Sequence, residues 1–123
     1  MQKKEWIALG LMSGTSGDGI DASIVRTDGM TNYETIDNKY FEYDVNIFKN
    51  IHILKDKIHK IEHLDRYNKE LNDLERKITL FHAKIIKELN LSDDTLVGFH
   101  GQTIYHSFEE KISKQLGNGK LLN

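Results

Sequence analysis

The 123-residue sequence contains no cysteine, and this absence excludes several kinds of site. Without a thiol there is no disulfide framework, no thiolate metal site and no cysteine nucleophile. Long hydrophobic runs are also missing, because no apolar stretch approaches the roughly 18 residues that a membrane-spanning helix needs. The apolar stretch behind the N-terminal lysines is short and leads into a glycine-rich turn. We therefore expect no signal peptide and a cytoplasmic location.

The sequence has no large excess of charge of either sign. Seventeen basic and nineteen acidic side chains give a net charge of −2, so the protein has no broad field to attract nucleic acid or an anionic membrane. We expect neither as a partner. Proline is absent too, which carries no information about function. The content of 38% hydrophobic and 29% charged residues is typical of a soluble globular chain, and the length fits one domain.

Hydrophobic periodicity predicts strands towards both ends of the chain and helices between them. The predicted strands are Glu5–Met12, Ile20–Arg26, Tyr33–Tyr43, Thr95–Phe99 and, more weakly, Lys111–Leu116. The first three follow one another closely, with turn residues between them, and this order predicts an antiparallel meander. The fold class predicted from this pattern is mixed α/β.

The middle of the chain has the period of amphipathic helices. Apolar residues recur every three or four positions from Ile47 to Ile61 and again from Leu64 to Leu89, which predicts two helices with one apolar face each. Asn46 is the expected N-cap of the first helix, and Asn90 is expected to end the second.

The turn between the first two predicted strands has the chemistry of an anion-binding loop. Its residues, Gly14–Gly19, include three glycines, which let backbone N–H groups point into one concavity. Hydroxyls at Ser13, Thr15 and Ser16 add donors that suit phosphate oxygens. Carboxylates at Asp18 and Asp21 could hold Mg²⁺, directly or through water.

Two familiar phosphate-binding motifs do not fit this loop. A P-loop requires Gly-Lys-Ser/Thr followed by a helix, whereas here a predicted strand follows. The dinucleotide fingerprint requires a different glycine spacing and again a helix. A phosphate-binding turn between antiparallel strands is instead how proteins of the actin-like ATPase and sugar-kinase superfamily begin.

Two separated motifs give the sequence a family resemblance. The run Gly10-Leu11-Met12-Ser13-Gly14-Thr15-Ser16-Gly17-Asp18-Gly19-Ile20-Asp21 resembles the N-terminal signature of anhydro-N-acetylmuramic acid kinases. The run His100-Gly101-Gln102-Thr103 is similar to a second motif of that family, and Gln115-Leu116-Gly117-Asn118 resembles a third stretch. At position 17 this sequence has glycine where the family usually has leucine. At position 99 it has phenylalanine where the family usually has serine.

The resemblance implies the N-terminal part of an actin-like ATPase domain, which is ribonuclease H-like: a meander, then helices and further strands. It implies ATP and Mg²⁺ as cofactors, with Asp18 the expected magnesium-facing residue. Ser13, His100, Gln102 and Thr103 would bind the amino-sugar substrate; alternatively, His100 and Gln102 satisfy buried backbone groups. The residues expected at the ATP phosphates are Gly14, Thr15, Ser16, Gly17, Asp18, Gly19, Ile20 and Asp21.

The implied reaction transfers the ATP γ-phosphate to 1,6-anhydro-N-acetylmuramic acid while water opens the anhydro ring. The product, N-acetylmuramic acid 6-phosphate, belongs to peptidoglycan recycling. We expect residues 1–123 to form a partial kinase domain, with the aspartate base and the second domain beyond Asn123 and no catalytic residue in this chain. Alternatives are a catalytically dead fragment or a phosphate- or amino-sugar-binding module. Expected partners are a second copy, since family members are typically dimers, or a separately encoded remainder.

Overall fold

Strands and helices follow one another much as the periodicity predicts. The structure is a computed structural model, and it describes residues 5–14, 16–29 and 32–122. The strands are β1 (Trp6–Ser13), β2 (Gly19–Thr27), β3 (Tyr33–Glu42), β4 (Leu96–Phe99), β5 (Gln102–Ser107) and β6 (Ile112–Leu116). The helices are α1 (Val45–Lys57), α2 (Ile61–Arg66), α3 (Asn68–Leu89) and α4 (Gly119–Leu122).

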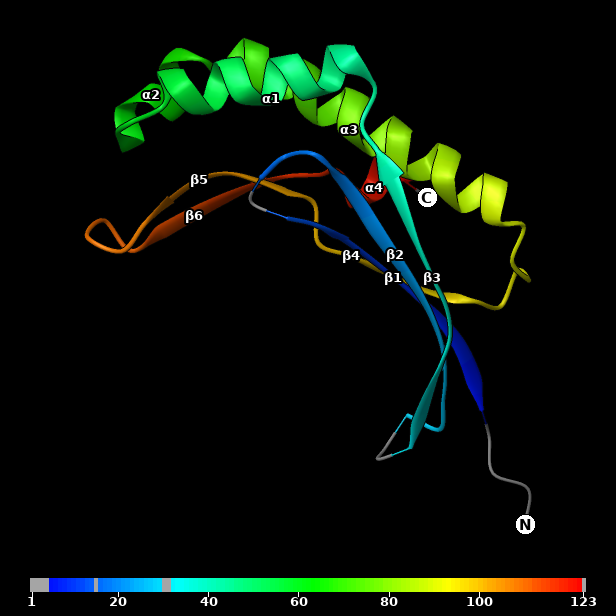
Figure 1. Ribbon diagram of the computed structural model, residues 1–123. Helices are drawn as coiled ribbons and strands as arrows, with labels where there is room; N and C mark the ends of the chain where they lie inside the picture. The colour runs from blue at the N-terminus through cyan, green and yellow to red at the C-terminus, as the bar shows by residue number, and fades with distance from the viewer. Residues whose placement is uncertain (1–4, 15, 30–31, 123) are drawn as a thin grey trace.

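The larger sheet has the strand order β3-β2-β1-β4. β1 pairs antiparallel with β2, and β2 antiparallel with β3, which confirms the predicted meander. β4 lies parallel to β1 on its other side, and β5 and β6 form a separate antiparallel hairpin. Figure 1 shows this hairpin extending beneath α1 and α2, away from the larger sheet. The predicted α/β class is confirmed.

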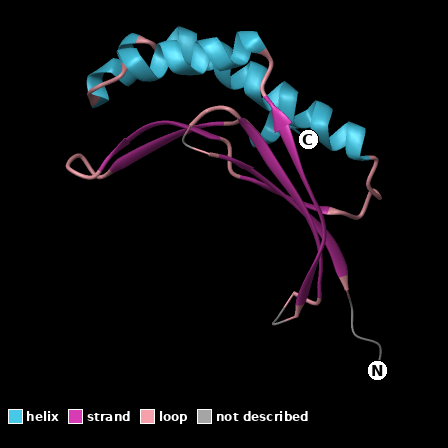
Figure 2. Ribbon diagram, in the orientation of Figure 1, coloured by secondary structure: helices cyan, strands magenta, loops and turns pink. Residues whose placement is uncertain are grey.

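The helices lie together on one side of the strands (Figure 2). Alternate residues of the strands face them, so that Leu9 and Leu11 of β1 and Ile20 and Ile24 of β2 are buried. The helices contribute their own apolar faces, including Ile51 of α1 and several residues of α3. Burying a side chain of this size contributes about 1.5–3 kcal/mol, so this interface accounts for much of the fold's stability.

The start of α1 differs from the sequence prediction. Asp44 caps the helix, because its backbone is extended and its Oδ1 accepts a hydrogen bond of 2.8 Å from the N–H of Ile47. The prediction of Asn46 as the N-cap is wrong, since Asn46 already lies inside the first turn. The predicted second helix is also interrupted: α2 ends at Arg66 and α3 begins at Asn68. Its predicted end at Asn90 is confirmed by a left-handed C-cap with φ 51°.

Two short elements were not predicted. β5 escapes a pattern search because it carries one buried apolar residue, Ile104, among polar and aromatic neighbours. Helix α4 spans only four residues, and the side chain of Asn118 caps it by accepting from the N–H groups of Lys120 and Leu121. Neither element shows the local periodicity by which the longer strands and helices were found.

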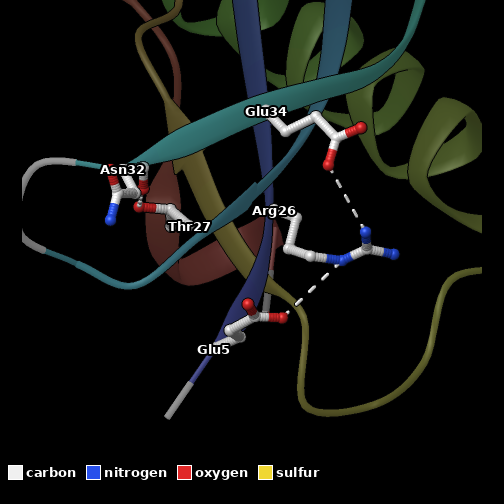
Figure 3. A network of polar contacts seen from close by, with 5 residues as sticks. All are labelled: Glu5, Arg26, Thr27, Asn32 and Glu34. Atoms are coloured by element: carbon white, nitrogen blue, oxygen red, sulfur yellow. Dashed lines mark hydrogen bonds and ion pairs between the residues drawn. The ribbon is translucent and has the colours of Figure 1, made fainter. Parts of the chain in front are cut away.

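The far end of the β2–β3 ribbon is held by exposed polar contacts (Figure 3). The hydroxyl of Thr27 donates to the carbonyl of Asn32 at 3.1 Å, while Arg26 lies between Glu5 at 3.9 Å and Glu34 at 3.5 Å. Exposed ion pairs of this kind contribute about 0–1 kcal/mol. Because β1 and β2 are antiparallel, this end lies opposite the glycine-rich turn, and its polar cluster is not part of the candidate site.

Candidate anion-binding site

The turn after β1 closes through a backbone hydrogen bond. The N–H of Gly17 donates to the carbonyl of Gly14 at 3.2 Å, and Gly17 has φ +72°, which favours glycine. A Cβ at this position would lie 2.8 Å from Cγ2 of Ile51 on α1. The turn therefore packs directly against α1, and Gly17 permits the contact. Thr15, expected at the phosphates, lies outside the described residues.

Gly19 allows a second close approach where the turn joins β2. A Cβ on Gly19 would collide with the carbonyl oxygen of Phe41 and lie 2.7 Å from the hydroxyl of Tyr40. The backbone of β2 can therefore lie flush against β3 at this point. Space and conformation together account for Gly17, and lack of space accounts for Gly19.

Two carboxylates stand exposed beside the turn, at Asp18 and Asp21. Asp18 lines a cavity of about 400 Å³ whose other lining residues include Tyr40, Glu42 and Tyr43. Asp21 lies opposite Tyr40 in the β2–β3 ladder. Among the described residues, no group of three or more His, Cys, Asp or Glu side chains gathers into a metal site.

Two carboxylates, those of Asp18 and Glu42, line the cavity. The pKa of Tyr40 is raised above its usual value, first by desolvation and then by the charges of Asp18, Glu42 and Asp21. A phosphate entering this region meets the carboxylates of Asp18 and Glu42. An accompanying cation would relieve the repulsion, and oxygen ligands of this type suit Mg²⁺.

The second motif reaches the same place because β4 is parallel to β1. His100 directly follows β4, and its N–H donates to the carbonyl of Leu11 on β1 at 3.3 Å. Gly101 turns the chain with φ +86°, and Gln102 then opens β5. Nε2 of Gln102 donates to the carbonyl of Gly14 at 2.8 Å, across 88 residues of sequence. The two motifs are thus joined by a direct hydrogen bond.

Helix α3 anchors the third motif. The N–H of Gly117 donates to Oε2 of Glu75 at 3.0 Å, and the N–H of Asn118 donates to the hydroxyl of Thr79 at 3.0 Å. Leu116 pairs with Gln102 in the β5–β6 ladder. The segment after β6 is therefore fixed to the helical layer and, through β5, to the glycine-rich turn.

The predicted site residues occupy different environments. Ser16, Asp18, Asp21 and His100 are exposed, whereas the side chain of Ile20 is fully buried in the core, so that only its backbone can contact a ligand. The hydroxyl of Thr103 accepts a long hydrogen bond of 3.5 Å from Gln115.

Ser13 and Gln102 are buried and bonded to the same partner, Tyr43. Tyr43 lines the cavity but was not singled out from the sequence. No motif or residue spacing in the sequence marked it.

Comparison with known proteins shows which family the sequence belongs to. The family model described as "Anhydro-N-acetylmuramic acid kinase" matches residues 6–123. The chain belongs to the anhydro-N-acetylmuramic acid kinase family. This confirms the resemblance inferred from the two motifs, and the family is one of ATP-dependent sugar kinases.

Three curated anhydro-N-acetylmuramic acid kinases illustrate the similarity. The kinase of Pelagibacter ubique is 57% identical over 98% of this chain and 33% of its own length. That of Agrobacterium fabrum is 36% identical over 94% of this chain and 32% of its own length. That of Caldanaerobacter subterraneus is 41% identical over 85% of this chain and 27% of its own length. The chain therefore spans about a third of the length of these relatives.

Proposed function

We propose that this chain supplies the phosphate-binding part of a kinase acting on 1,6-anhydro-N-acetylmuramic acid. The reaction would pass the ATP γ-phosphate to the sugar's 6-hydroxyl while water opens the anhydro ring, as a step of cytoplasmic peptidoglycan recycling. Family membership supports the reaction class. The observation that carries the proposal for this chain is the hydrogen bond from Gln102 to Gly14, which unites its two signature motifs.

The loop would bind the ATP phosphates through the backbone of Gly14–Asp21. Phosphoryl transfer depends mostly on positioning and charge neutralisation, and small residues give phosphate oxygens close access to N–H groups. The hydroxyls of Thr15 and Ser16 would add donors. Within the described residues, Ser16 is exposed beside the turn, as this role requires.

Asp18 is the residue that we propose to face Mg²⁺, with Asp21 in support. Their carboxylates are exposed, and after desolvation their charges help to raise the pKa of Tyr40. Mg²⁺ typically takes only one or two protein carboxylates and completes its shell with phosphate oxygens and water. A bound Mg²⁺ would neutralise charge that develops on the transferred phosphoryl group.

The sugar would be contacted by residues of the second motif. His100 is exposed next to β1, and Thr103 follows Gln102 on β5. The hydrogen atoms of the Gln102 amide already serve carbonyl groups of this chain, so we propose direct sugar contact for His100 and Thr103 first. Contact by Ser13 and Gln102 stays a prediction.

The remaining two-thirds of the kinase would complete the site. We propose that this part carries the general base and the second domain, and that residues 1–123 form part of a ribonuclease H-like domain. The open edge of β4 suits such a partner, because parallel strands are normally buried on both faces whereas Leu96 and Val97 are exposed. A second copy of the kinase would be a further partner, as in typical dimers of the family.

A coupled assay of ADP release tests the proposal directly. The 123-residue chain alone is expected to give no release that depends on ATP and the anhydro sugar, because one part of the site cannot exclude water. Co-expression with the C-terminal two-thirds of the Pelagibacter relative is expected to yield that activity. Failure of the pair to turn over, although both parts fold and associate, would count against the kinase assignment.

Binding without turnover is the second candidate for the chain on its own. The loop's shape is fixed by contacts within the described residues, which favours retained phosphate affinity. An NMR titration with Mg·ATP and with the anhydro sugar separates the cases. Shifts at Gly14, Gly17 and Gly19 would support a binding module, whereas no shift with either ligand would leave a catalytically dead fragment.

A further inference from the structure

A buried polar network lies directly behind the glycine-rich turn. Ser13, Tyr43 and Gln102 are 6%, 6% and 0% exposed, and they come from β1, from the segment between β3 and α1, and from β5. The hydroxyl groups of Ser13 and Tyr43 are 2.8 Å apart, and the Tyr43 hydroxyl lies 3.1 Å from Oε1 of Gln102. Buried polar groups are costly unless they are paired, so this network has a defined geometry.

The direction of each hydrogen bond follows from the available donors. The Gln102 amide nitrogen faces two carbonyl oxygens, those of Gly14 at 2.8 Å and Thr103 at 3.2 Å, so that end must be the NH₂ group. Its Oε1 then accepts the one phenolic hydrogen of Tyr43. The Ser13 hydroxyl must therefore donate to the Tyr43 oxygen. The chain of donation runs from Ser13 through Tyr43 and Gln102 to the carbonyl of Gly14.

Tyr43 also holds the other side of the turn. Its backbone N–H donates to the carbonyl of Asp18 at 3.0 Å. Gly14, at the start of the turn, is thus fixed through the Tyr43 side chain, and Asp18, near its end, through the Tyr43 backbone. Burial raises the pKa of Tyr43 to about 12, so the phenol remains a neutral donor at all working pH values.

We propose that Tyr43 is a positioning residue for the phosphate-binding loop. It acts through Gln102 on Gly14 and through its own backbone on Asp18, and so holds the turn in its closed shape before a ligand arrives. This inference rests on the proposed function, since it assigns the loop's shape a purpose in binding phosphate. The aromatic ring has a separate packing role, with its centre 5.4 Å from that of Phe81.

Tyr43→Phe separates the two roles, because it keeps the ring and removes the hydroxyl. Amide hydrogen exchange is expected to become about tenfold faster at Gly17, whose N–H closes the turn. Exchange at core amides such as Ile24 and Ile85 is expected to stay within about twofold. A purely structural role would instead accelerate loop and core amides in parallel. Tyr105→Phe is the matched control, since the Tyr105 hydroxyl bonds the exposed Glu110 away from the turn.

Gln102→Met provides a second variant in case Tyr43→Phe fails to fold. Methionine is close to glutamine in size and adds no charge, but it cannot donate to the Gly14 carbonyl, so faster exchange confined to the loop is again expected. Unchanged Gly17 exchange in either folded variant, or equal acceleration in loop and core, would overturn the proposal.

A titration with Mg·ATP distinguishes this inference from the proposed function. If the unsubstituted chain binds, Tyr43→Phe is expected to weaken affinity by about tenfold with little change in thermal midpoint, and unaltered affinity would contradict the proposal. If the unsubstituted chain does not bind, the proposed function loses support for this chain. The exchange measurement then still decides whether Tyr43 shapes the loop.

Discussion

At the scale of single residues, the glycines of the turn differ in how strongly the surrounding atoms require them. Gly17 adopts a positive φ and lies against Ile51, whereas Gly14 has ordinary space, since a Cβ at that position would lie 3.5 Å from Oγ of Ser16. Gly17 therefore leaves no room for a side chain, whereas Gly14 does. The stability of alanine variants measures this difference.

Gly17→Ala is expected to destabilise the fold by about 1–3 kcal/mol, because the new methyl group meets Ile51 in a strained backbone conformation. Gly14→Ala is the matched control and should change stability by no more than about 0.5 kcal/mol. Urea unfolding of both variants gives the comparison. Equal effects would show that the turn readjusts freely around Gly17.

His82 gives the molecule a pH dependence. Burial lowers its pKa, opposed by the hydrogen bond between Nδ1 and the carbonyl of Ile78, and within the described part of the chain its Nε2 has no partner. The pKa of histidine in the unfolded chain is about 6.5. Below that pH the unfolded chain binds a proton at His82 that the folded chain does not bind. Stability is therefore expected to fall as the pH drops below that value, until the folded pKa is reached.

Replacement by leucine tests this contribution. His82→Leu is expected to flatten the dependence of the urea midpoint on pH between about 7.5 and 5.5. His106→Gln, at an exposed position, should leave that dependence unchanged. A slope that survives in His82→Leu would assign the effect to other groups.

At the scale of elements, strands and helices with regular periods were predictable, while their ends were less so. The meander follows from apolar runs separated by turn residues, and α3 from a sustained period. The cap of α1 was not predictable with certainty because Asp44 and Asn46 are both good capping residues. The choice depends on which backbone stays extended, and Tyr43 fixes that through its bond to Asp18. The sequence prediction missed β5 because its composition is not typical of a strand. Its strand conformation is stabilised by the pairing with β6.

Asp44→Ala is expected to cost about 1 kcal/mol, since it removes the acceptor for the N–H of Ile47. Asn46→Ala should cost no more than about 0.5 kcal/mol, because Asn46 makes exposed contacts with Asn50 and Lys77. Asp44→Asn should keep most of the stability. A larger loss from Asn46→Ala than from Asp44→Ala, measured by urea unfolding, would contradict the assigned cap.

At the scale of the whole molecule, the sheet has two edges of different character. β3 carries charged residues along its edge, a common protection against unwanted pairing, whereas β4 exposes Leu96 and Val97, which suits contact with another protein surface. No helix in the described ranges has the length and apolar character to cross a membrane. The motifs could be found from sequence, but the hydrogen bond that joins them depends on how β4 and β5 dock, which no local pattern encodes.

Leu96→Lys is expected to reduce activity of the co-expressed pair at least about tenfold more than Ile36→Lys, because the lysine charge would have to be buried when a partner covers the exposed side chains of β4. The two positions match well, since Leu96 is 53% exposed on β4 and Ile36 is 47% exposed on β3. Both variants of the 123-residue chain alone should keep their urea midpoints. Equal loss of activity in the two pairs would place the contact elsewhere.

The hydrogen bond between Gln102 and Gly14 also sets an order of events during folding. The turn is synthesised early, but it acquires its final shape only after a residue 88 positions later has docked. Closing so long a loop is an entropic cost that later contacts must offset, and contacts distant in sequence slow folding. With no proline among these 123 residues, no prolyl isomerisation within them complicates the kinetics. Phosphate binding should thus appear only in the last step of refolding. Its appearance would indicate that the two motifs, distant in sequence, have come into contact.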